Sequence, residues 1–132
     1  MIAIKHRFTG ATICEFDVKT VKEALALAVS EEIDLSSADL SSADLSRAEL
    51  SRANLIYADL SSANLRSANL RSTDLSRADL SRANLSYADL SSAKIDGEKI
   101  TKDPLLITGL YYSCLITDGY MRLGCKRYTH AE

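Results

Sequence analysis

The chain has 132 residues, which is enough for one domain with a modest core. Hydrophobic residues make up 46% of the sequence but aromatic residues only 6%, so Leu, Ile and Ala must supply most of that core. The formal net charge is -2, from 16 basic and 18 acidic residues. This balance predicts neither a nucleic-acid-binding protein nor a uniformly anionic one, and direct nucleic-acid binding is not expected.

The first 32 residues (1–32) predict a hairpin followed by a helix. Alternating and β-branched residues over 2–18 surround the turn-forming sequence TGAT, a pattern typical of a β-hairpin. Thr20 and Glu23 then stand at capping-box spacing before an apolar set with helical spacing, which predicts a helix over 20–32. We find no signal peptide and no apolar run long enough to span a membrane, so the cytoplasm is the expected compartment.

A five-residue period dominates the middle of the chain. A large aliphatic residue stands at every fifth position from Leu35 to Leu90, and Ile95 and Ile100 continue the series. A small residue precedes each of them by two positions, from Ala38 to Ala93, with Thr73 in place of Ala once. Repeats of this kind have to be interpreted before any single segment, because they decide the architecture.

Neither a helix nor a flat strand fits this period. Five residues of an α-helix turn through about 500°, so successive leucines would spread around the whole helix. In a flat strand, an odd period would place alternate leucines on opposite faces. The pattern fits a chain that turns one corner in each pentapeptide, with the Leu and the small residue pointing inward. The sequence therefore predicts a square coil.

The units from Ala38 to Ser92 have the form A(D/N)LXX, with Thr73 and Glu49 as departures, and this motif resembles that of the pentapeptide-repeat family. The resemblance implies an all-β solenoid, namely a right-handed quadrilateral β-helix of about three coils. We assign it to residues 33–102. Four pentapeptides then form each coil, and the coils stack at a strand spacing of about 4.8 Å.

The last segment, 103–132, is predicted to contain a second hairpin over 109–125, with Asp118–Gly119 as its turn. We expect the two terminal segments to cover the ends of the coil, and either hairpin could pair two copies into a homo-oligomer. The flanks, including LITDGYMRLGCKRYTH, resemble those of small phage and prophage pentapeptide-repeat proteins. That resemblance implies a bacterial host cell and a chain that continues past Glu132.

Catalysis is not predicted. No serine lies in a GxSxG elbow, and the repeat serines suit tight corners. An acidic ladder of Asp39, Asp59 and Asp79 has a spacing of twenty, which stacks the three carboxylates on one side of the coil. Such a ladder could raise a pKa for acid–base work, but an exposed row relieved by arginines is the favoured interpretation.

No cofactor or metal site is predicted either. The only soft metal ligands are His6, Cys14, Cys114, Cys125 and His130. Cys125 and His130 have four residues between them, but one such pair does not make a site.

The outward positions of the coil carry the candidate binding residues. Ile56, Tyr57 and Tyr87 break the Ser/Arg rule of these positions and could form a hot spot for a protein partner. Folding the repeat into four sides also collects Arg47, Arg52, Arg66 and Arg71 on two neighbouring sides. The acidic ladder falls on the opposite pair.

The sequence therefore predicts a non-catalytic scaffold that presents rigid faces to a protein partner, whose identity it does not name. The alternative is a DNA mimic that binds a type II topoisomerase (gyrase), an activity known for some pentapeptide-repeat proteins. Residues 33–97 hold nine acidic and seven basic residues, which makes a DNA-like anionic surface the weaker prediction. A metal-dependent or hydrolytic enzyme is a remote alternative.

Overall fold

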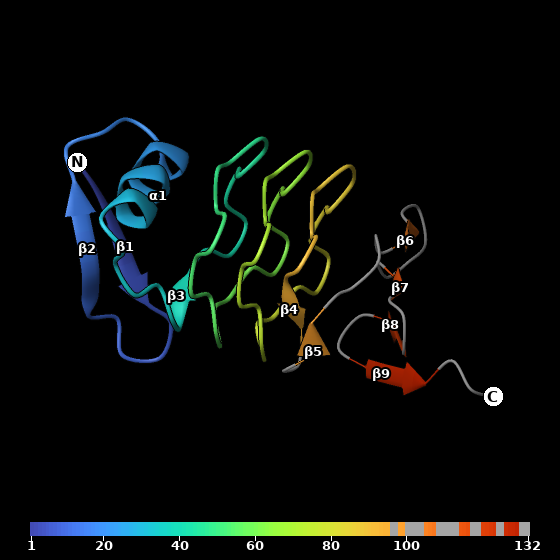
Figure 1. Ribbon diagram of the computed structural model, residues 1–132. Helices are drawn as coiled ribbons and strands as arrows, with labels where there is room; N and C mark the ends of the chain where they lie inside the picture. Colours follow the sequence, from blue (N-terminus) through green and yellow to red (C-terminus); the bar gives the residue numbers. More distant parts are fainter. Residues whose placement is uncertain (96–97, 100–104, 108–113, 117–119, 124–125, 130–132) are drawn as a thin grey trace.

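The computed structural model describes residues 1–95, 98–99, 105–107, 114–116, 120–123 and 126–129. A hairpin and a helix lie at one end of the molecule, the turns of a coil follow in the middle, and a small sheet lies at the other end (Figure 1). The chain therefore runs from one end of the coil to the other, one layer at a time.

The N-terminal hairpin consists of β1 (Ile2–His6) and β2 (Thr12–Phe16), which pair antiparallel. Gly10 in its turn has a φ of +69°, a left-handed conformation that glycine adopts at little cost. The predicted hairpin is present, and the structure adds a third strand. The short strand β3 (Ala38–Asp39) of the first coil pairs with β1, so the sheet order is β2-β1-β3. The hairpin is thus joined to the coil by backbone hydrogen bonds.

Helix α1 (Val21–Ser30) lies within the predicted range. Thr20 is its N-cap, and the Thr20 hydroxyl oxygen accepts a 3.2 Å hydrogen bond from the Glu23 N–H. The Glu23 carboxylate reaches back to the Lys19 N–H at 2.9 Å and not to that of Thr20, so the capping box is displaced by one residue. Ala24, Leu25 and Ala28 are buried on the inner face, and the helix contacts β1 and β2.

The coil advances by twenty residues per turn along four rows of parallel bridges. The rows are Asp39–Asp59–Asp79, Asp44–Asn64–Asn84, Glu49–Asn69–Asp89 and Asn54–Asp74–Lys94. From Leu40 to Leu75, the Leu N–H of each unit donates to a carbonyl of the next coil, as from Leu40 to Asp59 at 2.8 Å. The register is unbroken from the first row to the last. Each residue of the repeat therefore lies directly over the residue twenty positions earlier.

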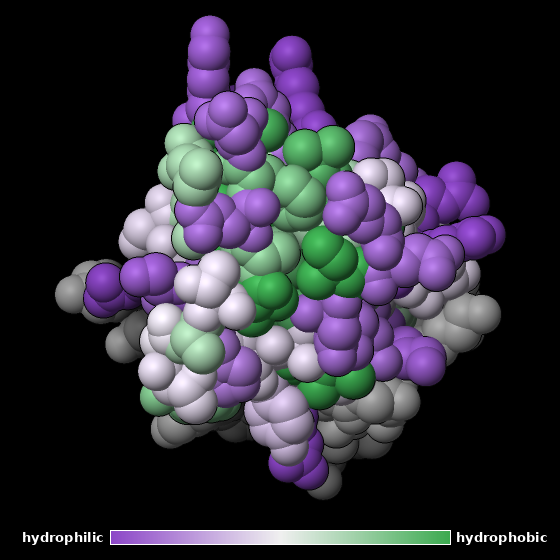
Figure 2. Space-filling model, turned by 90° about the vertical axis from the view of Figure 1, so that its left-hand side faces the viewer, coloured by the Kyte–Doolittle hydropathy of each residue, from purple (hydrophilic) through white to green (hydrophobic). Residues whose placement is uncertain are grey.

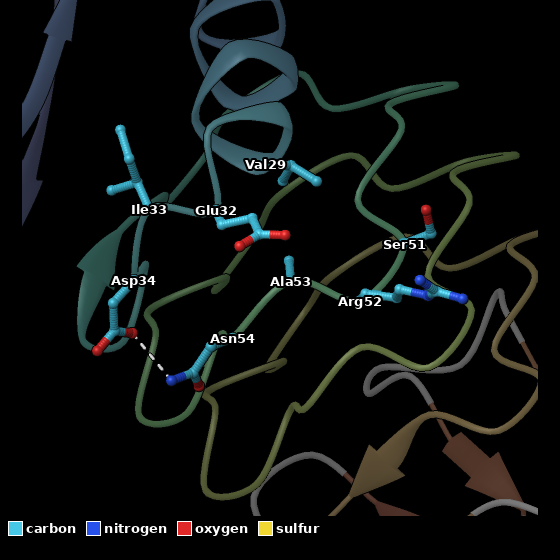
Figure 3. Close-up of a pocket in the computed structure, with 8 residues that line it drawn as sticks. All are labelled: Val29, Glu32, Ile33, Asp34, Ser51, Arg52, Ala53 and Asn54. Atoms are coloured by element: carbon cyan, nitrogen blue, oxygen red, sulfur yellow. Dashed lines mark hydrogen bonds between the residues drawn. The ribbon is translucent and has the colours of Figure 1, made fainter.

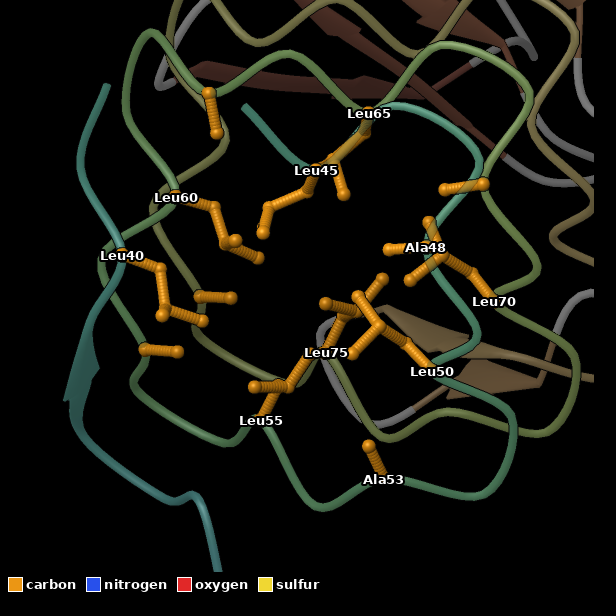
Figure 4. Close-up of a cluster of buried hydrophobic side chains, with 14 of the residues drawn as sticks. Leu40, Leu45, Ala48, Leu50, Ala53, Leu55, Leu60, Leu65, Leu70 and Leu75 are labelled. Carbon is orange, nitrogen blue, oxygen red and sulfur yellow. The ribbon is translucent and has the colours of Figure 1, made fainter. Parts of the chain in front are cut away.

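The interior is built from the leucine and small-residue columns, as predicted. Leu45, Leu65 and the other leucines of the repeat point into the coil and are at most 7% exposed (Figure 4). Burying each leucine contributes about 2 kcal/mol. Thr73 occupies a position that is otherwise Ala and is fully buried. Its hydroxyl donates a 2.8 Å hydrogen bond to the Leu50 carbonyl, so no polar group is left unpaired there.

Each corner is a tight turn whose third residue has positive φ. In the first unit the Ala38 N–H donates to the Leu35 carbonyl at 3.1 Å, and Ser37 between them has a φ of 57°. A positive φ at this position is the mark of a type II turn, which usually has glycine there. In this chain the position is held by Ser, Arg or Tyr from Ser37 to Ser92. Such residues pay about 1 kcal/mol each in this conformation, so the stacked coils must hold the corners in place.

The parallel rows stop at Lys94. Strand β4 (Lys94–Ile95) pairs antiparallel with β5 (Glu98–Lys99), so the chain turns back there. A four-stranded antiparallel sheet follows, in the order β6-β7-β8-β9. Its strands are β6 (Leu105–Ile107), β7 (Cys114–Ile116), β8 (Tyr120–Leu123) and β9 (Lys126–Thr129).

The sequence analysis predicted one hairpin in this segment. The β7–β8 pair lies where that hairpin was expected, while β6 and β9 were not predicted. The expected turn residues Asp118 and Gly119, and Ile100 of the aliphatic series, lie outside the described residues.

Candidate interaction surfaces

The Asp or Asn of each unit shapes the corner that follows it. In unit after unit, its Oδ1 accepts a hydrogen bond from the backbone N–H two residues later, as from Ser61 to Asp59 at 3.0 Å. This bond defines an Asx turn, which short carboxylate and amide side chains form and Glu49 does not reproduce. The residues that make it are Asp34, Asp39, Asp44, Asn54, Asp59, Asn64, Asn69, Asp74, Asp79, Asn84 and Asp89.

Several repeat serines add a second bond to the same turn. The hydroxyl groups of Ser41, Ser61 and Ser91 each donate to the aspartate two residues earlier, at 2.6–2.7 Å. Hydrogen bonds from the Ser91 side chain and backbone hold the pKa of Asp89 below its ordinary value. These contacts favour a structural role for the repeat serines and carboxylates.

In three of the four rows an asparagine donates to the carboxylate one coil earlier, and in two of these rows it separates two carboxylates. The Asn54 amide donates to Asp34 at 2.9 Å, and the Asn69 amide donates to Glu49 at 2.8 Å. Asn64 does the same for Asp44, at 3.2 Å. A neutral donor between two coils removes one like-charge contact, which at strand spacing would cost a few kcal/mol at an effective dielectric of 20.

The acidic ladder of Asp39, Asp59 and Asp79 has no asparagine. Its relief comes from the hairpin instead, because the Arg7 Nη2 atom lies 3.6 Å from the Asp59 Oδ2 atom. Both side chains are about one-fifth exposed, at 21% and 22%. An exposed row relieved by arginines was expected from the sequence, but Arg7 was not among the candidate residues. Nothing in the local sequence indicates that the hairpin turn reaches this side.

Arg7 also belongs to an aromatic surface, here called the Tyr57 patch and made of Arg7, Phe8, Tyr57 and Arg77. The Arg7 Nη1 atom donates to the Tyr57 carbonyl at 3.0 Å, and its guanidinium lies 4.9 Å from the centre of the Phe8 ring. The Arg77 guanidinium lies 5.5 Å from the Tyr57 ring centre and donates to the Tyr57 hydroxyl at 2.8 Å. Phe8 is 67% exposed and Tyr57 42% exposed.

Ile56 is half-buried, whereas Tyr57 is exposed. The two residues therefore do not form the exposed Ile–Tyr pair that was interpreted from the sequence. Its N–H donates to the Asn54 side chain, and its carbonyl accepts a hydrogen bond from the Ser37 N–H. Ile56 is the second residue of this corner, whereas Tyr57 is the third, with positive φ. The structure therefore places Tyr57 with Phe8 and the two arginines.

A second surface, here called the basic hollow, gathers candidate residues from the other side of the coil. It has a volume of about 500 Å³ and is lined by Lys22, Ser46, Arg47, Asn64, Arg66 and Ser67. The exposed Tyr87 ring belongs beside it, because the Arg66 guanidinium lies 5.6 Å from the Tyr87 ring centre. Arg47 and Arg66 were placed on the same pair of neighbouring sides from the sequence, but Lys22 of α1 was not predicted as a residue of this surface.

The other two candidate arginines lie elsewhere. Arg52 lines a groove of about 530 Å³ between the end of α1 and the first coil, together with Glu32 and Asp34 (Figure 3). In that view the Arg52 side chain extends away from both carboxylates. Arg71 lies 3.9 Å from the Asp89 carboxylate in an exposed ion pair. The candidate residues thus fall on separate surfaces.

The N-terminal end carries apolar groups as well. Figure 2 looks onto this end and shows hydrophobic side chains gathered among polar ones. Met1 at the start of the hairpin is 78% exposed, and Leu27 on α1 is 40% exposed. The end is therefore amphipathic, in contrast to the polar walls of the coil.

The soft metal ligands are not brought together where the structure describes them. Cys14 is half-buried in β2, and burial raises the pKa of its thiol. In the described ranges, no three His, Cys, Asp or Glu side chains are grouped to hold a metal ion. Cys125 and His130 lie outside these ranges. Among the helices described, none has both the length and the apolar character needed to cross a membrane.

Comparisons with known proteins agree with this architecture. The family model "Pentapeptide repeats" matches residues 33–71 and 63–97, with eight copies. No curated protein matches the chain.

Several solved structures do match it. The pentapeptide repeat protein Rfr23 from the cyanobacterium Cyanothece 51142 is 38% identical, over 48% of this chain and 40% of its own, with a TM-score of 0.36. HetL from the cyanobacterium Nostoc sp. strain PCC 7120, a protein involved in heterocyst differentiation regulation, is 39% identical over 50% of this chain and 38% of its own, with a TM-score of 0.36.

A pentapeptide repeat protein of the Arabidopsis thaliana thylakoid lumen is 33% identical over 48% of each chain, with a TM-score of 0.35. This chain spans less than half the length of each of these structures, and TM-scores this low do not establish a shared overall shape.

The repeat motif, the four parallel rows and the family model all point to the same architecture, a right-handed quadrilateral β-helix. Over residues 33–97, the chain belongs to the pentapeptide-repeat family.

Proposed function

We propose that this protein is a non-catalytic scaffold that binds a protein partner through the Tyr57 patch. The observation that carries the proposal is the position of Arg7, whose guanidinium lies over the exposed Phe8 ring of the hairpin and also donates to the backbone carbonyl of the exposed Tyr57 on the coil. Tyr and Arg are the residue types that dominate binding energy at protein interfaces.

The patch is also held in place before any partner arrives. The Tyr57 hydroxyl is fixed by Arg77, and the Tyr57 backbone is fixed both by the coil and by Arg7. Side chains that are already ordered lose little entropy on binding, which favours affinity. Two guanidinium groups beside two aromatic rings suit a partner surface that presents carboxylates around an apolar residue.

The DNA-mimic alternative receives less support. Only the row of Asp39, Asp59 and Asp79 is wholly acidic among the described rows, and Arg7 neutralises part of it. A mimic of duplex DNA needs regularly spaced negative charge over a longer surface. We retain the cytoplasm as the proposed compartment, and the phage-like origin of the flanks stays a prediction.

The test is an affinity capture from bacterial lysate, with captured proteins identified and then titrated against the purified chain. The variant Phe8→Ser/Tyr57→Ser removes both rings, and Tyr87→Ser is its matched control, because Tyr87 occupies the same corner position on another side. Serine already occupies this position in several units, so we expect each variant to melt within a few degrees of the parent.

We expect the parent and Tyr87→Ser to bind the captured partner equally. The double variant should bind it at least about tenfold more weakly. Equal binding by all three proteins would contradict the proposal. Capture of gyrase by all three, lost only when Asp39 and Asp79 are changed to Asn, would support the DNA-mimic alternative instead.

A further inference from the structure

The basic hollow is lined only by polar and charged residues, and three of the six are cations. Lys22 comes from the first turn of α1, Arg47 from the first coil and Arg66 from the second. The Arg47 N–H donates to the Arg66 carbonyl at 2.9 Å, so the two arginines are neighbours across the stacked coils. No carboxylate belongs to the lining.

Two of the three cations are held in position. The Lys22 ammonium donates a 3.2 Å hydrogen bond to the Ser46 carbonyl, and its side chain is half-buried. The Arg66 guanidinium lies over the exposed Tyr87 ring, which restricts its motion without neutralising its charge. Two of the three cations are therefore positioned by contacts within the protein.

The charge of the hollow is not balanced within the described part of the chain. Arg7 and Arg71 each lie within 4 Å of an aspartate, but no such contact is found there for Arg47 or Arg66. Arg52 also has none in this part of the chain, yet the groove that it lines holds no second cation. Asp44 accepts hydrogen bonds from two residues of the lining, and its pKa is lowered by hydrogen bonds from Ser46 and, less strongly, by the charge of Lys22 and by Asn64.

Asp44 thus offsets about one of the three positive charges, so that the hollow keeps a net charge of about +2. A phosphate monoester carries about -1.5 to -2 at pH 7, whereas a carboxylate carries -1. Guanidinium groups bind phosphate oxygens through two parallel hydrogen bonds. The Ser67 hydroxyl is a further donor on the same lining, while the Asn64 amide already donates one hydrogen bond to Asp44.

We propose that the basic hollow binds a phosphate monoester, with Lys22, Arg47 and Arg66 as the charged ligands of the phosphate group. The hollow is open to solvent, so the rest of a monoester can extend out of it beside the phosphate group. Tyr87 is a positioning residue, because it acts on the ligand only through Arg66. This site is on a different side of the coil from the Tyr57 patch and does not depend on the proposed function.

The test is a titration of the full chain at constant ionic strength, with binding measured by calorimetry and by ³¹P NMR. The probes are inorganic phosphate, O-phosphoserine and, as a carboxylate control, glutamate. We expect O-phosphoserine to bind more tightly than phosphate, and glutamate to bind at least about tenfold more weakly than either. Absence of binding by both phosphate probes would overturn the proposal, and equal binding of glutamate would overturn its assignment to phosphate.

The repeat offers a matched pair of variants. Arg47→Ser/Arg66→Ser removes one arginine from each of the two outward repeat positions, and Arg71→Ser/Arg82→Ser removes the same residues from the same positions outside the hollow. Serine occupies the equivalent positions of neighbouring coils, so both proteins are expected to fold, and melting curves check this. The proposal expects at least about a tenfold loss of phosphate affinity in the first variant and less than about a twofold loss in the second.

Equal losses in both variants would show that phosphate responds to net charge only, and would overturn the site. The role of Tyr87 has its own readout. Tyr87→Ser should weaken binding about threefold, while Tyr87→Phe, which keeps the ring under Arg66, should restore it. Should Arg47→Ser/Arg66→Ser fail to fold, the single change Lys22→Gln in α1 provides the same test without altering the coil.

Discussion

The interior and the outer wall of the coil follow different rules. Inside, Leu and Ala recur in every repeat unit from Ala38 to Ser92 except the one that has Thr73, and a side chain such as Leu65 is fully buried. On the wall, the two variable positions hold Ser, Arg, Tyr or Ile with no change in the backbone, whose corners keep φ between 55° and 64° from Ser37 to Ser92. The interior therefore determines the fold, and the wall is free to carry binding surfaces.

The largest expected effect comes from a charge in the interior. Leu65→Lys would place an ammonium group among buried leucines with no partner, and we expect it to cost more than about 4 kcal/mol and to prevent folding at room temperature. Chemical denaturation measures this, with Ser67→Lys on the wall as the control. A stable Leu65→Lys protein would show that the leucine column does not face the interior.

The second-largest effect is expected at the corner residue with positive φ, which lies on the wall but has a constrained backbone. Ser62 has a φ of 58° and an exposed side chain. Ser62→Val puts a β-branched residue in a left-handed conformation and should cost about 1–2 kcal/mol, whereas Ser62→Gly should be neutral or slightly stabilising. Similar melting temperatures for both variants would mean that the corners are not strained.

Asp59 shares features of both regions, because its side chain is partly exposed and its Asx turn also shapes the corner. Asp59→Ala removes the acceptor for the Ser61 N–H and hydroxyl and should cost about 1 kcal/mol. Asp59→Asn keeps the Oδ1 acceptor. It loses the ion pair with Arg7 but also removes the like-charge contacts with Asp39 and Asp79, so its cost should stay below about 0.5 kcal/mol. If the two changes cost the same, the charge of Asp59 matters more than its Asx turn.

The smallest effect is on acid stability. The pKa values of Asp44 and Asp89 are lowered in the folded chain by hydrogen bonds from Ser46 and Ser91. The stabilisation they supply is present above the ordinary value of 3.8 and is lost as the pH falls through the lowered values. Between about pH 5 and about pH 2.5, the parent should lose slightly more thermal stability than Asp44→Asn/Asp89→Asn. An identical pH dependence would contradict this assignment.

The same division explains what the sequence could predict. The leucine columns, the four sides and the positions of the hairpin and α1 follow from local periodicity, because the repeat dictates which residues face inward. Contacts between distant segments could not be found in this way. The pairing of β1 with β3, the reach of Arg7 to Asp59 and the place of Lys22 beside Arg47 all depend on how the N-terminal segment sits on the first coil.

The candidate residues show the same limit. Unusual residue types at the outward positions identified Tyr57, Tyr87, Arg47 and Arg66. Each of them belongs to the Tyr57 patch or to the basic hollow and its edge. Ile56 was expected to be exposed, because periodicity gives the direction of a side chain and not the depth to which its neighbours cover it. Phe8 and Arg7 carried no signal, since a charged or aromatic residue in a hairpin turn is common.

The twenty-residue register has a consequence for how such a protein can change. Duplication of a whole coil would leave every later residue on the side it already occupies. Duplication of a single pentapeptide would preserve the leucine interior as well, but it would turn everything after it by a quarter of a revolution. The basic hollow combines residues from two successive coils, so a gain or loss of five codons between Arg47 and Arg66 would separate its ligands while the solenoid still folded. Repeat slippage in the gene can thus rearrange the surfaces of this protein without a cost to its core.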